Sequence, residues 1–371
     1  MGLLCLVLCG CITEYNPKGI DEEEDILVVE GIITDDESYI TLSRSLNLTV
    51  GEASTQYVYN ARVYVECDDG GSILSESPSC GSNGYFDYNS NRYVINTGKL
   101  NPEHKYRLKI EIDEDVYCSD YSYPIQTPEI DSIFWAKRGK GQPVMIYVAT
   151  HEPRGKVLYY RWSYKEDWEY FANYYLENYP YYCWDKANNR DLLLGNTEKT
   201  IFGKLTDKIT EIAPSNIKLS YLYRIDVTQN VISKRAFDYF ANIKKNAQQT
   251  GSIFAPIPSE LRGNITCTTD PERPVIGYVD ISTTTKKCRY ISFTEGAYES
   301  PGFNRDCELV PRDSLMKWYD HIPNEYVLTN PREVELSPMA IPYYIKVKCV
   351  DCTYYGGVAQ KPDDWPPDNH H

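Results

Sequence analysis

The stretch KYRLKIEI, residues 105–112, alternates apolar and charged side chains from one position to the next. Successive side chains of a β-strand point to opposite faces of the sheet, so the alternation puts one row against a core and the other in water. The apolar row is Tyr106, Leu108, Ile110 and Ile112, and the charged row is Lys105, Arg107, Lys109 and Glu111. This pattern predicts a half-buried strand in an antiparallel sheet.

Similar strand patterns recur at intervals of roughly ten residues on both sides of that stretch. The β-rich runs 25–34 and 39–48 flank the acidic turn Asp35-Asp36-Glu37, which predicts a hairpin. The runs 61–67 and 72–77 flank the sequence Asp-Asp-Gly-Gly, whose glycines can supply the positive φ angles of a tight turn. We therefore predict an N-terminal immunoglobulin-like antiparallel β-sandwich over residues 26–127.

The longer remainder, residues 128–365, mixes strand patterns with longer connections and is predicted to be a larger β-rich domain with a few helices. Residues 155–168 predict a strand that leads into a loop or a short helix. A short helix is also predicted over residues 311–321. The strongest helical pattern lies in residues 233–252, where one face carries Ala236, Phe237, Phe240 and Ala241. The predicted fold class is thus mainly β.

Composition restricts the classes of function. The chain has 371 residues, a formal net charge of -15 and a pI near 4.9. This length suits two domains, and the acidity argues against nucleic acid, because binding phosphates requires clustered Lys and Arg. Tyrosine is abundant, with 34 residues against 9 phenylalanines. A tyrosine ring buries apolar area and keeps a polar hydroxyl, which suits wide, half-exposed β-surfaces and binding faces.

The amino terminus predicts where the protein resides. Residues 1–11, MGLLCLVLCGC, form an apolar run with a glycine before its last cysteine, as in a bacterial lipoprotein signal whose lipidated residue would be Cys11. The run is much shorter than the ~20 residues of a membrane-spanning helix. Residues 12–25 form an acidic tether, and residues 366–371 a tail. We expect a lipid-anchored outer-membrane protein that faces the cell exterior.

The cysteines after the signal are nine in number, and an oxidising envelope favours disulfides among them. Because nine is odd, at least one thiol stays unpaired within the chain. Cys349 and Cys352 have the spacing of a zinc knuckle or a redox centre, but no second ligand pair and no βαβ pattern accompany them. A direct bridge between them would close a strained loop, so we expect at least one to reach a distant partner such as Cys307.

The order of several phrases along the chain resembles the domain-of-unknown-function 4249 family of Bacteroidota outer-membrane lipoproteins. The stretch from 254 to 264 and the later pair Gly277-Tyr278 are the most specific part of this resemblance. The phrases that carry it are LVVEGIIT (27–34), ARVYVECDDGG (61–71), KYRLKIEI (105–112), PIQTPEIDSI (124–133), YYRW (159–162), SKRAFDYFANIKKNAQQTGSIFAPIPSELRGNITC (233–267), VIGYVDIS (275–282) and CVDCTYYGGVAQKPDDW (349–365).

This resemblance implies an outer-membrane lipoprotein, often encoded beside a TonB-dependent transporter. No reaction is established for the family, so the resemblance implies no catalytic residues. Members commonly have an aromatic residue where this chain has Asp364 before Trp365.

Motifs that would indicate an enzyme are missing from the sequence. His104, His151 and His321 have no partner at zinc-helix spacing, and there is no HExxH, G-x-S-x-G, P-loop or GxGxxG sequence. A calcium loop at Asp68-Asp69 is conceivable, but a hairpin turn explains the same residues. We therefore predict no catalytic residues, no metal and no cofactor, and we expect that the protein is not an enzyme. A hydrolase acting on glycans or peptides is the disfavoured alternative.

The segment DWEYFANYYLENYPYYCWD, residues 167–185, has the strongest binding character. It is too rich in aromatic residues for one strand or helix face to bury, and tyrosine and tryptophan are frequent in binding hot spots. The segment predicts either a ligand or protein interface or the packing of two domains on each other. Its aromatic residues are Trp168, Tyr170, Phe171, Tyr174, Tyr175, Tyr179, Tyr181, Tyr182 and Trp184.

The favoured function is a non-catalytic accessory subunit that binds a TonB-dependent, SusC-like outer-membrane transporter in nutrient uptake. The alternative is a structural subunit of a complex that assembles or secretes outer-membrane proteins. In either case, the expected partner is an outer-membrane β-barrel protein: the transporter in the first case and a barrel-assembly complex in the second.

Overall fold

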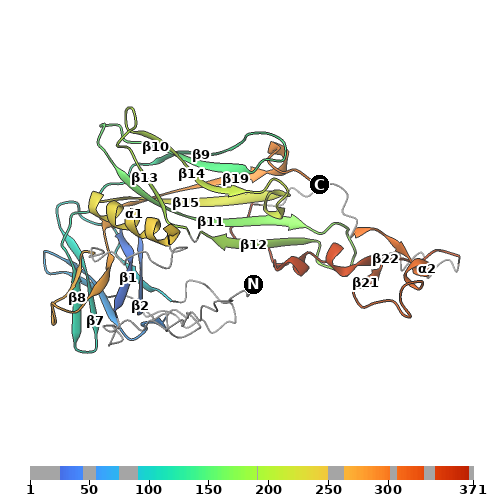
Figure 1. Ribbon diagram of the computed structural model, residues 1–371, viewed down its shortest axis with the longest axis horizontal. Helices are drawn as coiled ribbons and strands as arrows, with labels where there is room; N and C mark the ends of the chain where they lie inside the picture. Colours follow the sequence, from blue (N-terminus) through green and yellow to red (C-terminus); the bar gives the residue numbers. More distant parts are fainter. Residues whose placement is uncertain are drawn as a thin grey trace, which may run out of the picture.

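Two β-sandwiches and a small third sheet make up the computed structural model of the chain (Figure 1). The mainly β fold class is therefore confirmed. The predicted signal, the acidic tether and the last five residues lie outside the described part of the chain. The structure describes residues 26–44, 56–74, 91–189, 191–249, 263–300, 307–329 and 339–366.

The first sandwich packs a six-stranded sheet against a five-stranded sheet around one shared core. The apolar row of residues 105–112 points into this core and the charged row points away from it, as the alternation predicts. The six-stranded sheet contains β1 (Leu27–Thr34), β2 (Glu37–Arg44), β3 (Gln56–Tyr57), β6 (Tyr93–Asn96), β17 (Val275–Tyr278) and β18 (Ile281–Ser282). The five-stranded sheet contains β4 (Arg62–Cys67), β5 (Ser72–Leu74), β7 (Tyr106–Ile112), β8 (Asp115–Ser119) and β16 (Ile265–Cys267).

The first sandwich differs from the predicted domain over residues 26–127, because three of its strands come from much later in the chain. Strands β17 and β18 pair in parallel with β1, and β16 pairs with β8. Ile265 and Ile281 are buried in the first core. If the edge of β1 were unpaired, its backbone N–H and C=O groups would be exposed. Strands β17 and β18 pair with that edge and add apolar residues to the core. Local periodicity carries no information about such a return.

Gly277 is a point of close approach between the returning segment and β1. A Cβ atom at this position would lie 2.4 Å from the carbonyl oxygen of Val29, its partner in the parallel ladder. Gly277→Ala is expected to lower the free energy of unfolding by about 3 kcal/mol, because the ladder must shift to admit the methyl group. Chemical denaturation measures the change. Gly139→Ala is the control, since a Cβ there meets nothing within 4 Å, and equal losses in both variants would contradict the prediction.

The second sandwich packs a three-stranded sheet against a five-stranded sheet. Its longest strand, β11, continues through Phe171, so residues 165–168 do not form the predicted loop or short helix. Pairing with β15 along one edge and with β12 and β13 along the other keeps this segment extended. The strands are β9 (Ile130–Lys137), β10 (Val144–His151) and β14 (Lys204–Ile212) in one sheet, and β11 (Tyr159–Phe171), β12 (Tyr182–Asn188), β13 (Leu193–Asn196), β15 (Leu222–Ile232) and β19 (Thr284–Ser292) in the other.

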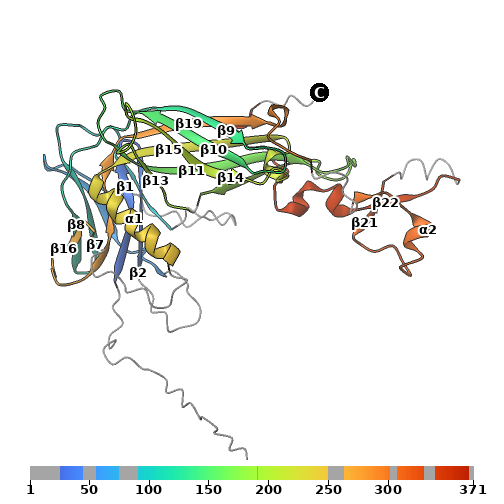
Figure 2. The ribbon, with the colours of Figure 1, turned by 45° about the horizontal axis from the view of Figure 1, so that its top comes forward.

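The predicted long helix is α1 (Lys234–Gln249), which lies where the two sandwiches meet (Figures 1 and 2). Ala236 and Tyr239 are its most buried side chains among those described. The predicted apolar face included Ala236 but not Tyr239. Tyr239 contacts Tyr278 of the first sandwich, and Phe237 contacts Tyr159 of the second. The helix therefore packs against both sandwiches. The short helices are α2 (Arg312–Leu315), η1 (Ile217–Leu219), η2 (Phe293–Glu295), η4 (Val347–Cys349) and η5 (Cys352–Tyr355).

A small third sheet projects beyond the second sandwich, at the end away from the first (Figure 2). It contains β20 (Val310–Pro311), β21 (Tyr326–Leu328) and β22 (Tyr343–Lys346). A disulfide joins Cys307 to Cys349 in its core, and a second disulfide joins Cys352 to Cys183 of β12. The two cysteines of the terminal pair thus have different distant partners. The second bridge, together with the hydrogen bonds between Trp184 and Val358, fixes the end of the chain on the second sandwich.

Candidate functional site

A cleft of about 760 Å³ lies between the two sandwiches. One wall is formed by β1 and β2 of the first sandwich, and the other by the outer face of β11, β15 and β19. Alternate residues of β11 and β15 point into their own core, so the intervening polar residues of these strands face the cleft. The volume is in the range of sites that enclose small molecules.

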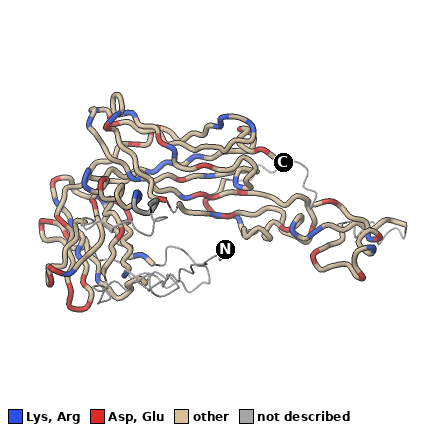
Figure 3. The backbone as a smooth tube through the Cα atoms, viewed as in Figure 1, with Lys and Arg blue, Asp and Glu red and all other residues tan. Residues whose placement is uncertain are grey.

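The cleft is lined by charged side chains of both signs. Its six basic and six acidic residues balance, although the chain as a whole carries a charge of -15. Acidic and basic residues are interspersed over both sandwiches (Figure 3). The basic residues of the cleft are Arg92, Arg161, Lys165, Lys186, Arg224 and Lys286, and the acidic residues are Glu30, Asp36, Glu37, Asp167, Asp226 and Asp364.

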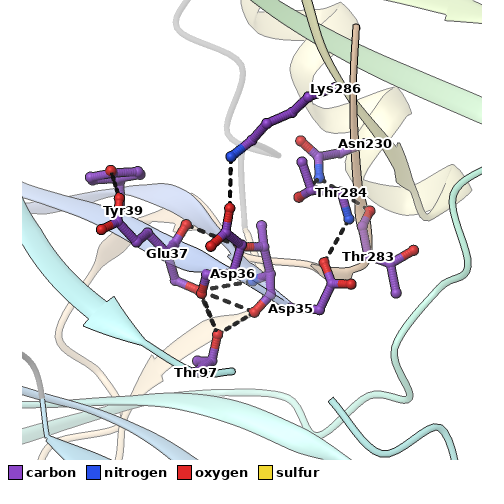
Figure 4. A network of polar contacts seen from close by, with 11 residues as sticks. Asp35, Asp36, Glu37, Tyr39, Thr97, Asn230, Thr283, Thr284 and Lys286 are labelled. Carbon is purple, nitrogen blue, oxygen red and sulfur yellow. Dashed lines mark hydrogen bonds and ion pairs between the residues drawn. The ribbon is translucent and has the colours of Figure 1, made fainter. Parts of the chain in front are cut away.

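At one end of the cleft, a polar network ties the β1–β2 turn to β19 (Figure 4). The Asp35 carboxylate accepts a hydrogen bond of 2.8 Å from the backbone N–H of Thr284, and Asp36 forms an ion pair of 2.7 Å with Lys286. The ion pair lowers the pKa of Asp36. Thr97 donates a hydrogen bond of 2.8 Å to the Asp36 carbonyl oxygen. These contacts hold the two walls together at one end.

Two cleft residues of β11, Arg161 and Asp167, keep their charges unpaired. Neither side chain has a hydrogen bond or ion pair with any residue that the structure describes, although the Arg161 guanidinium packs on the Phe240 ring at 4.8 Å. Burial lowers the pKa of Arg161, while the charge of Glu30 across the cleft acts in the opposite direction. Both side chains are half-buried. A charge that is partly removed from water without a partner costs free energy, so a ligand of complementary charge would be favoured here.

The segment that carries Asp364 and Trp365 also contributes to the cleft. Asp364 forms an ion pair of 2.5 Å with Arg224, and the Trp365 indole N–H donates a hydrogen bond of 2.8 Å to Glu169. Trp365 is buried against Tyr290. Asp364 therefore holds a cleft arginine.

Asp167→Asn is expected to raise the free energy of unfolding at neutral pH, by about 1 kcal/mol. Burial raises the pKa of Asp167. The positive charge of Arg224 acts against this rise, and the negative charges of Asp226 and Asp364 add to it. A raised carboxyl pKa means that stability falls as the pH rises from about 3.8 through the folded-state value. The variant should therefore match the natural protein in acid and exceed it above that window. Urea denaturation over a pH series tests this, and a constant difference at every pH would contradict it.

The predicted aromatic segment is divided among three environments. Trp168, Tyr170 and Trp184 are buried in or against the second sandwich. Tyr179 packs on the core of the third sheet, and Tyr181 on the core of the second sandwich. The two large sandwiches are not clamped together by this segment. Phe171, Tyr174 and Tyr175 are exposed, and Tyr182 is half-buried.

Some of these rings continue into a row of contacts across the end of the second sandwich, which we call the aromatic row. Tyr175, Tyr181, Phe171, Tyr221 and Phe293 follow one another with ring centroids 5.6–5.8 Å apart. Phe171, Tyr175 and Phe293 are 41%, 71% and 49% exposed. Tyr221 and Phe293 lie far from the aromatic segment in sequence, so composition could not reveal their place in the row.

The described histidines do not gather into a catalytic group. His104 pairs with Asp68 and His151 with Asp131, on different sandwiches. His321 lies in the connection between α2 and β21. In the sequence, the cleft is marked only by charged or polar residues at every second position of β11 and β15. This pattern shows that one face of the sheet is polar, but it does not show that the first sandwich covers that face.

Comparison with known families identifies the chain. Residues 12–288 match the family model described as a domain of unknown function (DUF4249), so the chain belongs to this family. No curated protein matches the sequence. No helix in the described part of the chain has the length and apolar character needed to cross a membrane.

Proposed function

We propose that this member of the DUF4249 family is a non-catalytic binding subunit of an outer-membrane TonB-dependent transporter in nutrient uptake. In this proposal Cys11 carries the lipid anchor, the protein faces the cell exterior, and the inter-sandwich cleft captures a polar nutrient. The observation that carries the binding role is the balanced set of charges in the cleft, with Arg161 and Asp167 unpaired among the described residues.

The cleft favours a ligand that carries both signs of charge, such as a short peptide. Arg161 would bind a carboxylate, because a guanidinium offers several hydrogen-bond donors in a fixed plane. Asp167 would bind an ammonium group. A purely anionic ligand would meet six acidic side chains in the cleft and an acidic protein around it. A ligand with both charges avoids that repulsion.

The aromatic row supports the proposed partner. Exposed aromatic rings that contact one another form an apolar surface, and such surfaces commonly bind other proteins. The row lies on the end of the second sandwich away from the first, so a barrel protein could bind there while the cleft stays accessible. An outer-membrane assembly complex would use the same surface, and this is the second candidate function.

Affinity purification in mild detergent distinguishes the two candidates. Recovery of a TonB-dependent barrel supports the transporter role, and recovery of a barrel-assembly complex supports the alternative. Phe171→Ala combined with Tyr175→Ala is expected to abolish co-purification. Phe202→Ala is the matched control, since this ring is 83% exposed on another loop of the second sandwich.

Uptake of short peptides tests the role of the cleft. A deletion strain that carries the Arg161→Gln variant is expected to lose uptake and to retain co-purification of the barrel. Arg154→Gln is the control, because its side chain is 73% exposed outside the cleft. Unchanged uptake in the deletion strain for every peptide tested would rule out the transport role.

A further inference from the structure

The turn after β4 and the turn before β7 bring together a thiol, a carboxylate and an imidazole. Cys67 ends β4, Asp68 begins the turn, and His104 comes from the connection between β6 and β7. The His104 Nδ1 atom lies 2.9 Å from Asp68 Oδ1, and the Cys67 Sγ atom lies 3.8 Å from the same oxygen. The three potential metal-ligand atoms of Cys67, Asp68 and His104 all lie within 4.8 Å of one another.

We propose that Cys67, Asp68 and His104 form a zinc-binding site on the first sandwich. Thiolate sulfur, imidazole nitrogen and carboxylate oxygen are the ligands that zinc takes in proteins. A metal ion held at about 2.0–2.3 Å from each donor places the donors roughly 3–4 Å apart. The present separations of 2.9 and 3.8 Å are already close to that arrangement.

The chemistry of the donors selects the class of ion. Calcium and magnesium prefer oxygen ligands throughout, whereas sulfur and imidazole favour zinc and other late transition metals. With a thiolate, a carboxylate and a neutral imidazole, a divalent ion has its charge balanced. On binding, the Cys67 thiol releases its proton to solvent, and His104 presents its Nδ1 lone pair with its remaining proton on Nε2. A water molecule completes the four-coordinate shell.

Backbone hydrogen bonds fix the two turns before any ion binds. The backbone N–H of Asp68 donates to the Lys105 carbonyl oxygen at 3.0 Å, which joins one turn directly to the other. The N–H of Cys67 donates to the Gly71 carbonyl oxygen at 2.8 Å, and Gly70 takes a φ of 89° that favours glycine. The donors therefore need little rearrangement, and an ion would join the β4–β5 turn to the β6–β7 connection.

Metal titration of the full chain tests the site. Zinc binding is measured by competition with a chromophoric chelator, and cobalt is used as a spectroscopic substitute that shows a thiolate charge-transfer band in the near ultraviolet. The background protein carries His370→Ala and His371→Ala, so that the terminal imidazoles do not bind metal. One zinc per chain is expected, with a cobalt band that disappears in Cys67→Ser. His104→Ala is expected to weaken zinc binding by at least about tenfold.

Two matched controls carry part of the donor set. Cys288 is an exposed thiol near Asp226 without a described histidine beside it, and His151 pairs with Asp131 without a thiol. Cys288→Ser and His151→Ala should leave zinc affinity and the cobalt band unchanged.

Zinc should also raise the melting temperature of the natural sequence but not that of Cys67→Ser, whose fold is checked by circular dichroism. A cobalt band that survives Cys67→Ser, absence of zinc binding, or a disulfide at Cys67 in a peptide map would overturn the proposal.

Discussion

Replacing both Cys183 and Cys352 by alanine is expected to lower the free energy of unfolding by about 5 kcal/mol. The bridge closes a loop of 169 residues, and a cross-link that closes a longer loop removes more conformational freedom from the unfolded chain. Both cysteines are fully buried, and Cys352 anchors the segment that carries Asp364 and Trp365 to the cleft. The variant should therefore lose stability and also release Asp364 and Trp365 from the cleft.

Urea denaturation followed by tryptophan fluorescence measures this loss, because Trp184 lies beside Cys183 in the second sandwich. The matched control replaces Cys307 and Cys349, whose bridge closes 42 residues, for which about 4 kcal/mol is expected. That second loss should be confined to the third sheet, since both cysteines belong to its own small core. If reduction leaves the unfolding midpoint of the natural protein unchanged, the assigned role of the bridges is incorrect.

Lys218→Met is expected to lower the free energy of unfolding by about 3–5 kcal/mol. Glu166 points from β11 toward the second core and is 5% exposed. One of its carboxylate oxygens lies 2.6 Å from Lys218, and the other accepts a hydrogen bond of 2.6 Å from the Tyr223 hydroxyl. Burial, and then the charge of Glu166, raises the pKa of Tyr223, so Tyr223 remains a donor. Without Lys218 a buried carboxylate loses its compensating charge.

The double variant Lys218→Met, Glu166→Gln provides the control for this pair. A neutral glutamine removes the uncompensated charge and can still accept the hydrogen bond from Tyr223, so most of the lost stability should return. Denaturation of both single variants and of the double variant gives the coupling energy. A double variant that is as unstable as Lys218→Met alone would show that lost packing of the lysine on Trp168, rather than charge, is responsible.

The cleft and the proposed zinc site can be tested independently, because they use different residues. Arg161 and Asp167 lie in the cleft on the second sandwich, whereas Cys67 and His104 lie on turns of the first sandwich. Loss of peptide uptake in a cleft variant should leave the cobalt spectrum unchanged. Loss of zinc in Cys67→Ser should leave the aromatic row and its partner in place.

The sequence by itself determined the local elements. Alternation over residues 105–112 predicted a strand and its buried face, and the acidic turn Asp35-Asp36-Glu37 predicted the first hairpin. The helical pattern placed α1 correctly, although it missed Tyr239. At residues 165–168 the pattern was read as a loop or short helix, because a strand with charged residues on one face resembles a polar connection. Each correct result depended on neighbours within a few positions.

Only the tertiary structure decided how those elements combine. Strands β16, β17 and β18 complete the first sandwich from more than a hundred residues away, and the same return places Thr284 and Lys286 at the cleft. The tertiary structure likewise brings together the bridged cysteines and the proposed zinc ligands from separate segments of the chain. The physical reason is that periodicity reports which face of an element is buried, whereas pairing is set by which sheet edge and which core remain to be covered. That information is distributed over the whole chain.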